Sequence, residues 1–275
     1  MKIVYRIRTM TNDLPNDLKD KVCQTAELIA KAGRVVVFTG AGVSTESGIP
    51  DFRSPGGLWS KFDPDDFTIE RFLYSPETRK RQWKFLLEGG IFSQAQPNAA
   101  HKAIAWLETT GKLTCVITQN VDDLHQKAGN SPEKVYELHG NMKWLKCLDC
   151  FERYPLDVLL SRFRGTDEVP ACSRCQGILK PDVIFFGESL PTQTLKEATH
   201  AASNCDLLIV IGSSLVVYPA AYIPLYAKGG GGKLVIINKT ETSYDANADV
   251  VIHGGAGEVM NGIVAVLQKM DVSCA

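Results

Sequence analysis

The sequence lacks an excess of charge of either sign. Its 30 basic and 31 acidic residues leave a formal net charge of -1. Proteins that bind nucleic acid by neutralising phosphates usually carry a basic excess. The short basic run at residues 79–81 is interpreted as a solvated helix face. Direct binding of nucleic acid is therefore not expected.

Long apolar runs are also missing. No stretch reaches the roughly 18 apolar residues of a membrane-spanning helix, so no membrane partner is expected. Residues 1–10 carry three charges and no apolar core, which argues against a secretory signal. We therefore expect a reducing, cytoplasmic location. The eight cysteines would not form a disulfide framework there, and metal binding is the alternative use to examine.

Short apolar runs without polar alternation predict the buried strands of a parallel sheet. Segments with helical spacing lie between several of them, such as the stripe of Val22, Ala26 and Ile29, which ends before Gly33. Strands that alternate with helices predict an α/β fold with a Rossmann-like, doubly wound parallel sheet. The predicted strands are 35–38, 113–117, 183–186, 207–211, 234–237 and 250–252, and further helical stripes lie at 100–107 and 260–267.

Two segments interrupt this alternation. Residues 58–97 are rich in aromatic and charged side chains and are predicted to form a helical insertion. Residues 142–180 hold paired cysteines and are predicted to form a small zinc-binding domain with a zinc-ribbon fold. Residues 17–57, 98–141 and 181–270 are then left to form the Rossmann-like nucleotide-binding domain.

Four of the eight cysteines form two closely spaced pairs, Cys147 with Cys150 and Cys172 with Cys175. Two residues between paired cysteines let both thiolates bind one ion, and two such pairs complete a tetrahedral Zn²⁺ site. The loop between the pairs has 21 residues, just beyond the usual range of about 15–20. Because four sulfur ligands leave no open position for water or substrate, the zinc is expected to be structural. A zinc ribbon by itself would also fit a non-enzymatic binding module.

A glycine-rich turn, with Gly40 and Gly42, follows the first predicted strand. Gly-x-Gly between a strand and a helix suits dinucleotide phosphates, because glycine lets the backbone approach them and the helix N-terminus offers free amide donors. The usual third glycine is replaced by Thr45. The acidic residue expected about 20 positions later is also missing. Both absences disfavour a conventional NAD dehydrogenase.

Residues 40–53 (GAGVSTESGIPDFR) closely resemble the defining motif of the sirtuin family. Further sirtuin motifs follow in order: TQNVD at 118–122 with Leu124 and His125, ELHGN at 137–141, the cysteine quartet, PDVIFFGE at 181–188, GSSLVVYP at 212–219, and Asn238. The resemblance covers roughly residues 20–265 and is greatest to compact bacterial and archaeal members. It implies an NAD-dependent protein lysine deacetylase, which transfers the acyl group from lysine to ADP-ribose and releases nicotinamide. Its partners would be acetylated proteins or peptides.

The resemblance also implies where NAD, the co-substrate, would lie. The turn at 40–42 would line the pyrophosphate. The loop at 51–53 would close over NAD, with Phe52 beside the nicotinamide. The residues at 212–214 and Asn238 would contact the adenosine half. The full set expected to bind NAD is Gly40, Ala41, Gly42, Thr45, Asp51, Phe52, Arg53, Gln119, Asn120, Val121, Asp122, Gly212, Ser213, Ser214, Asn238 and Ala256.

The catalytic residues implied by the resemblance are His139, Asn120 and Asp122. His139 matches the catalytic base. In the implied reaction the acyl-lysine carbonyl oxygen attacks the ribose carbon that bears nicotinamide, and a ribose hydroxyl must then lose a proton. A side chain that titrates near neutrality suits that transfer. Asn120 would contact the nicotinamide ribose, and Asp122 would hydrogen-bond the nicotinamide carboxamide.

The acyl-lysine is expected to lie between two backbone segments, 184–187 and 215–217, as an added strand. Apolar side chains there suit the uncharged stem of an acyl-lysine. The residues expected to bind the substrate are Ile184, Phe185, Gly187 and Val217.

A missing pair of residues narrows the range of acyl groups that the protein is expected to accept. Sirtuins that prefer succinyl or malonyl groups carry a Tyr-x-x-Arg pair in the helical insertion, and Leu86 and Gly89 stand at the two matching positions. A buried carboxylate with no cation would cost several kcal/mol. We therefore expect acetyl groups, with longer apolar acyl groups as a further class, rather than succinyl groups.

Three other functions share parts of this sequence pattern. A protein mono-ADP-ribosyltransferase also begins with the departure of nicotinamide, so the site residues do not separate it from a deacetylase. A non-enzymatic zinc-ribbon module predicts no release of nicotinamide. A conventional dehydrogenase predicts formation of NADH.

Overall fold

The computed structural model describes residues 16–88, 90, 92, 94–166 and 168–272. A sheet of six parallel strands, in the order β3-β2-β1-β7-β8-β9, forms the centre of its larger part. This is the Rossmann order, in which the chain reverses direction across the sheet between β1 and β7 and leaves a crevice at their carboxyl ends. The strands are β1 (Val35–Thr39), β2 (Leu113–Thr118), β3 (Val135–Glu137), β7 (Leu207–Ile211), β8 (Lys233–Asn238) and β9 (Val250–His253).

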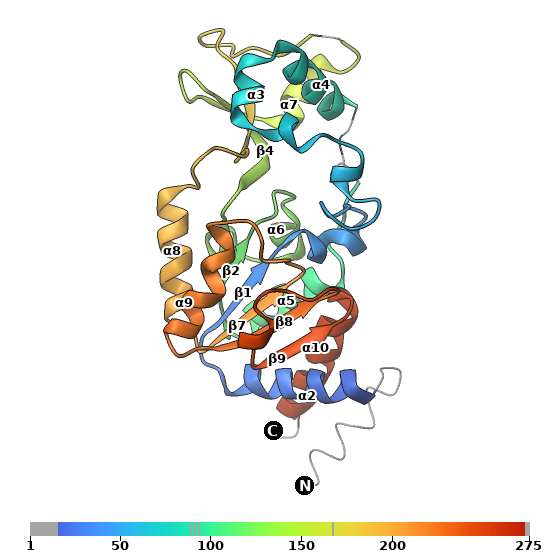
Figure 1. Cartoon of the computed structure of the whole chain (residues 1–275), viewed down its shortest axis with the longest axis vertical. Helices are drawn as coiled ribbons and strands as arrows, with labels where there is room; N and C mark the ends of the chain where they lie inside the picture. The colour runs from blue at the N-terminus through green and yellow to red at the C-terminus, as the bar shows by residue number, and fades with distance from the viewer. Residues whose placement is uncertain (1–15, 89, 91, 93, 167, 273–275) are drawn as a thin grey trace.

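Helices cover both faces of this sheet, which explains why its strands are largely apolar (Figure 1). Successive side chains of a strand point to opposite faces. Val35 and Val37 of β1 accordingly belong to one apolar core, and Val36 and Phe38 to the other. The first face packs against α2 (Asn16–Lys31), α5 (Ala99–Thr109) and α10 (Ala256–Val272), and the second against α8 (Thr192–Ser203) and α9 (Ile223–Gly229). The predicted α/β class and Rossmann-like sheet are confirmed.

One predicted strand is wrong, because its first residue belongs to a second, smaller sheet. It has three antiparallel strands in the order β5-β4-β6. Val183 ends β6 and pairs with Gly140 of β4, so the strand predicted at 183–186 is not part of the parallel sheet. The residues after Val183 are apolar because they line a cavity. The elements of this part are β4 (Gly140–Cys147), β5 (Arg153–Pro155), α7 (Leu156–Phe163) and β6 (Leu179–Val183).

In its described residues, the segment predicted to be a helical insertion contains two α-helices that pack on the smaller sheet. Figure 1 shows α3, α4 and α7 together at the end of the molecule opposite α2. Trp83 of α4 is fully buried and shares an apolar core with Leu145 of β4 and Leu159 of α7. The segment comprises η2 (Leu58–Ser60), η3 (Pro64–Phe67), α3 (Ile69–Tyr74) and α4 (Pro76–Leu87).

The remaining short elements connect these parts. They are η1 (Ala41–Ser47), α6 (Leu124–Ala128), η4 (Pro132–Lys134), η5 (Ala220–Tyr222) and η6 (Asp245–Asn247). Within the described part of the chain, no helix combines the length and the apolarity needed to cross a membrane.

Candidate functional site

A cavity of about 820 Å³ lies at the crevice of the parallel sheet. Its lining comes from the carboxyl ends of β1, β2, β7 and β8, from the helical insertion, and from the segment after β6. Every residue that the sequence predicts to bind NAD, to bind acyl-lysine or to act in catalysis lines this one cavity. Their individual roles stay predictions.

Two glycine turns meet at the reversal point of the sheet. The Gly40 amide donates to the Ile211 carbonyl over 3.1 Å, and the Gly42 amide donates to the Gly212 carbonyl over 2.8 Å. A Cβ atom on Gly42 would lie 2.8 Å from the Cα of Gly212, closer than real Cβ atoms approach. Glycine is therefore required here for contact between two backbones, in addition to any approach by a phosphate. The helix after the first turn is the 3-10 helix η1.

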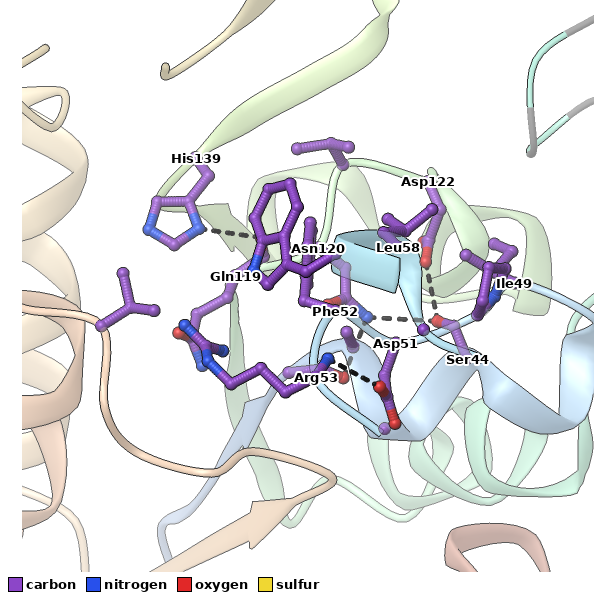
Figure 2. Close-up of a pocket in the computed structure, with 18 of the residues that line it drawn as sticks. Ser44, Ile49, Asp51, Phe52, Arg53, Leu58, Gln119, Asn120, Asp122 and His139 are labelled. Carbon is purple, nitrogen blue, oxygen red and sulfur yellow. Dashed lines mark hydrogen bonds between the residues drawn. The ribbon is translucent and has the colours of Figure 1, made fainter. Parts of the chain in front are cut away.

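A buried carboxylate stands on one wall of the cavity. The Ser44 hydroxyl donates to Asp122 Oδ2 over 2.7 Å, and the Leu124 amide donates to Asp122 Oδ1 over 3.0 Å. Burial raises the pKa of Asp122, while these two hydrogen bonds act in the opposite direction. Asn120 Nδ2 donates to the same Ser44 oxygen over 3.1 Å, as Figure 2 shows. Both carboxylate oxygens are thus held in place, and each keeps a lone pair for an amide donor of a ligand.

His139 lies in the short link between β3 and β4. In Figure 2 it stands on the opposite side of the view from Asp122. Its Nδ1 atom is 2.9 Å from the Gln119 carbonyl oxygen. Because a carbonyl oxygen only accepts hydrogen bonds, Nδ1 carries the proton and Nε2 keeps its lone pair. Burial lowers the pKa of His139, and the bond to Gln119 offsets part of that shift. The imidazole is therefore neutral at pH 7 and can accept a proton at Nε2.

The loop predicted to close over NAD is ordered by its own carboxylate. Asp51 Oδ1 accepts from the amides of Arg53 and Ser54 over 3.0 and 2.8 Å. Phe52 lies between Asp51 and Arg53 in the sequence, and its ring packs against Trp59 with centroids 5.0 Å apart. Phe52 is 39% exposed and lines the cavity. The Phe52 ring is therefore available to cover a bound ligand. A ring packed in the core would not be.

Two buried histidines lie next to Ser44 and Thr39, and no sequence pattern predicts that they meet. His101 Nε2 is 3.5 Å from the Ser44 hydroxyl, and His125 Nε2 is 2.9 Å from the Thr39 hydroxyl. Their ring centroids are 5.0 Å apart. Burial lowers the pKa of His101 to about 4 and that of His125 to about 3. Both rings are therefore neutral near pH 7, and they support the Ser44 side of the site without adding charge.

The part of the cavity under the helical insertion is apolar and carries one paired cation. Arg81 lines the cavity, and its Nη2 atom donates to both oxygens of Asp66 over 2.9 Å. Leu86 is buried and also lines the cavity. Gly89, the other position compared with acid-preferring sirtuins, lies outside the described residues.

The four predicted zinc ligands meet in one cluster. Their sulfur atoms all lie within 4.8 Å of one another. Cys147 Sγ is 3.5 Å from Cys175 Sγ, and Cys150 Sγ is 3.6 Å from Cys172 Sγ. Four sulfurs bound about 2.3 Å from a tetrahedral zinc would lie roughly 3.8 Å apart. The cluster therefore fits a closed zinc site, with all four positions taken by cysteine.

The fold and the two sites define a nucleotide-binding α/β protein with a Rossmann-like sheet and a separate four-cysteine metal module. Within that class, the chain belongs to the Sir2 family, whose family model matches residues 40–219.

The relatives are similar over almost the whole chain. The NAD-dependent protein deacylase 2 of Archaeoglobus fulgidus is 46% identical over 255 residues, which are 92% of this chain and 98% of that protein. The NAD-dependent protein deacetylase of Thermodesulfovibrio yellowstonii is 45% identical over 253 residues, which are 91% and 96% of the two chains. A solved Sir2 structure with a p53 peptide and NAD+ has a TM-score of 0.79 at 39% identity, covering 90% of this chain and 98% of that one.

Proposed function

We propose that this chain is an NAD-dependent protein lysine deacetylase, which moves the acetyl group of an acetylated lysine to ADP-ribose and releases nicotinamide. One observation carries the proposal: the free Nε2 of His139 and the buried carboxylate of Asp122 line the same cavity. The relatives named NAD-dependent deacetylases and deacylases support it.

The residues of the cavity divide the work between binding and proton transfer. When bound, NAD supplies the ribose carbon from which nicotinamide departs. Asp122, held by Ser44, accepts a hydrogen bond from the N–H of the nicotinamide carboxamide. Gln119 donates to Ser213 over 2.8 Å, so the wall joining the two halves of the nucleotide site is fixed before a ligand binds. His139 takes the ribose hydroxyl proton at Nε2, since Nδ1 is occupied by Gln119.

The substrate is an acetylated protein or peptide. Phe185 is buried, and Val217 lines the cavity from the loop between β7 and η5, so the expected acyl-lysine stem meets apolar side chains. The metal cluster contributes structure only, because its four cysteines fill a tetrahedral shell. We extend the proposal to a reducing, cytoplasmic location, where cysteines stay as thiols.

The test is nicotinamide release from NAD with an acetyl-lysine peptide, with the acetyl group followed by mass spectrometry. The expected result is peptide-dependent release, with acetyl on ADP-ribose. Acetyl transfer should be lost in His139→Ala and kept in His200→Ala, an exposed histidine on α8. The His200→Ala control distinguishes the effect of losing the catalytic base from the effect of replacing any histidine by alanine.

The same assay distinguishes the alternatives. ADP-ribose attached to protein would identify a mono-ADP-ribosyltransferase. NADH formation would identify a dehydrogenase. No nicotinamide release with any acyl peptide, from a folded and zinc-loaded protein, would leave a binding module.

A further inference from the structure

An apolar surface begins at the rim of the cavity and extends beyond the residues assigned to the reaction above. Tyr218 lines the cavity, yet 54% of its surface is exposed. Its ring lies beside that of Tyr222, with centroids 4.6 Å apart. The aromatic surface therefore continues from inside the cavity to the outside of the molecule.

The surface extends along η5 and α9. Ile223 and Ala227 face the core and are fully buried, whereas Tyr222 and Tyr226 are 45% and 43% exposed. Residues four apart lie on one face of a helix, so the two tyrosines share the outer face. Residues 216–227 contain no charged residue. The first charge on α9 is Lys228, which is paired with Asp249 over 3.1 Å. Up to that residue the helix is apolar on its solvent face as well as on its core face, and such a face marks an interaction surface.

We call this surface the tyrosine ledge. It consists of the exposed large side chains Val216, Tyr218, Tyr222, Leu225 and Tyr226.

We propose that the tyrosine ledge binds an apolar side chain of the substrate polypeptide, a few residues from the acetylated lysine; this inference rests on the proposed function. Tyr218 directly follows Val217, which belongs to the segment expected to pair with the peptide backbone. Both residues line the cavity that holds His139. The ledge is thus continuous with the place where the acetyl-lysine must lie.

The composition of the ledge selects the kind of side chain. Tyrosine rings offer large apolar faces at low cost in conformational entropy, and they are enriched where binding energy concentrates. With no carboxylate or cation in residues 216–227, the ledge favours an aromatic or branched aliphatic side chain over a charged one.

The size of the ledge favours a peptide over a second copy of this chain. A stable interface between two folded proteins takes roughly 20–30 residues from each side, and the ledge has five. A peptide that is already anchored by its acetyl-lysine needs only a small additional contact to gain affinity.

The test compares matched acetyl-lysine peptides in which Leu, Trp or Ser is placed in turn at each of the neighbouring positions. The wild-type chain is expected to prefer Leu or Trp over Ser at one position by roughly five- to tenfold in kcat/KM, through KM rather than kcat. The double variant Tyr222→Ser/Tyr226→Ser should lose this preference while keeping its activity on the Ser peptide. Tyr74→Ser removes another highly exposed tyrosine, on α3, and should leave the preference intact.

Three results would overturn the proposal: no preference at any position, a preference that survives in the double variant, or an equal loss on all peptides in a variant that unfolds like the wild type. A wild-type dimer that the double variant converts to a monomer in sedimentation would assign the ledge to self-association instead. Failure of the proposed function is distinct, because the wild type would then release no nicotinamide even with the Ser peptide.

Discussion

The Ser44 hydroxyl donates to Asp122 across 2.7 Å, and both side chains are buried. The bond joins η1, which follows β1, to the loop that follows β2. The two loops therefore share one wall of the cavity, and a ligand that binds Asp122 depends on both.

Removing this bond should weaken NAD binding. In Ser44→Ala, Asp122 loses a donor that lowers its pKa, so more of it is protonated and it is less firmly held. A hydrogen bond to a charged group contributes about 1.5–3 kcal/mol, and we expect the KM for NAD to rise roughly tenfold or more. Since the defect comes partly from protonation, it should shrink as the pH rises. Ser47→Ala is the control, because Ser47 contacts Asn98 instead. An unchanged KM in Ser44→Ala would contradict this role.

The pH profile should report the buried base. Burial lowers the pKa of His139 below its ordinary value of 6.5, so the neutral, proton-accepting form persists below that pH. The acidic limb of kcat/KM for acetyl-lysine peptide at saturating NAD should accordingly have its midpoint below 6.5. A midpoint above 6.5 would show that the imidazole is not desolvated during turnover.

The pair His101 and His125 should make folding sensitive to acid. Both have a folded-state pKa below the unfolded value of 6.5. The unfolded chain therefore binds more protons as the pH falls from 6.5 toward about 3, and stability falls with it. Urea unfolding of His125→Gln should show a flatter dependence on pH in this window than the wild type. Equal slopes would mean that the protonated rings are accommodated in the fold.

Loss of zinc should destabilise the smaller sheet and abolish activity. Cys150→Ser removes one ligand from the cluster, and structural zinc contributes on the order of 10 kcal/mol to small domains. Metal analysis should show one zinc per wild-type chain and almost none in the variant, which should also melt at a lower temperature. Cys205→Ser, a buried cysteine outside the cluster, reports the cost of a polar hydroxyl in the core. Full activity without zinc would show that the cavity does not depend on the structure of the zinc site.

Acyl selectivity should depend on the pairing of Arg81. Its guanidinium lines the cavity but is engaged by Asp66, so it is not free to meet an acyl carboxylate. We expect succinyl-lysine to react at least roughly a hundredfold more slowly than acetyl-lysine, because burying an unpaired carboxylate costs several kcal/mol. Asp66→Asn should raise the succinyl-to-acetyl ratio of kcat/KM. Equal rates in the wild type would sink the prediction.

The strands of the large sheet were predictable where burial on both faces removes polar residues. The run at 207–211 coincides with β7. Strand β3 has only three residues, too few for a pattern to emerge. At 183–186 the apolar character reflects the lining of a cavity, and composition alone does not separate that from a strand.

Contacts that depend on the folded arrangement could not be predicted from the sequence. The buried Lys180 pairs with Glu188 over 3.0 Å, although a lysine in a strand is expected at the surface. Likewise His101 and His125 belong to different helices, α5 and α6. Only the folded arrangement of these helices brings the two rings together. The motif residues at 40–42, 119–122 and 212–214 directly follow β1, β2 and β7, whose carboxyl ends face the same crevice. The individual roles of the motif residues are implied by the resemblance to the sirtuin family and stay predictions.

His139 occupies the boundary between the two sheets. Gly140, the next residue, begins β4 of the smaller sheet, and the returning chain is tied to the same point, because the Ile184 amide donates to the His139 carbonyl over 2.8 Å. Asp122 belongs to a loop of the parallel sheet. The base is therefore held from both sides, by Gln119 next to the parallel sheet and by Ile184 next to the smaller sheet, and a small rotation at this joint would change the reaction rate while every residue in contact with a ligand stayed the same.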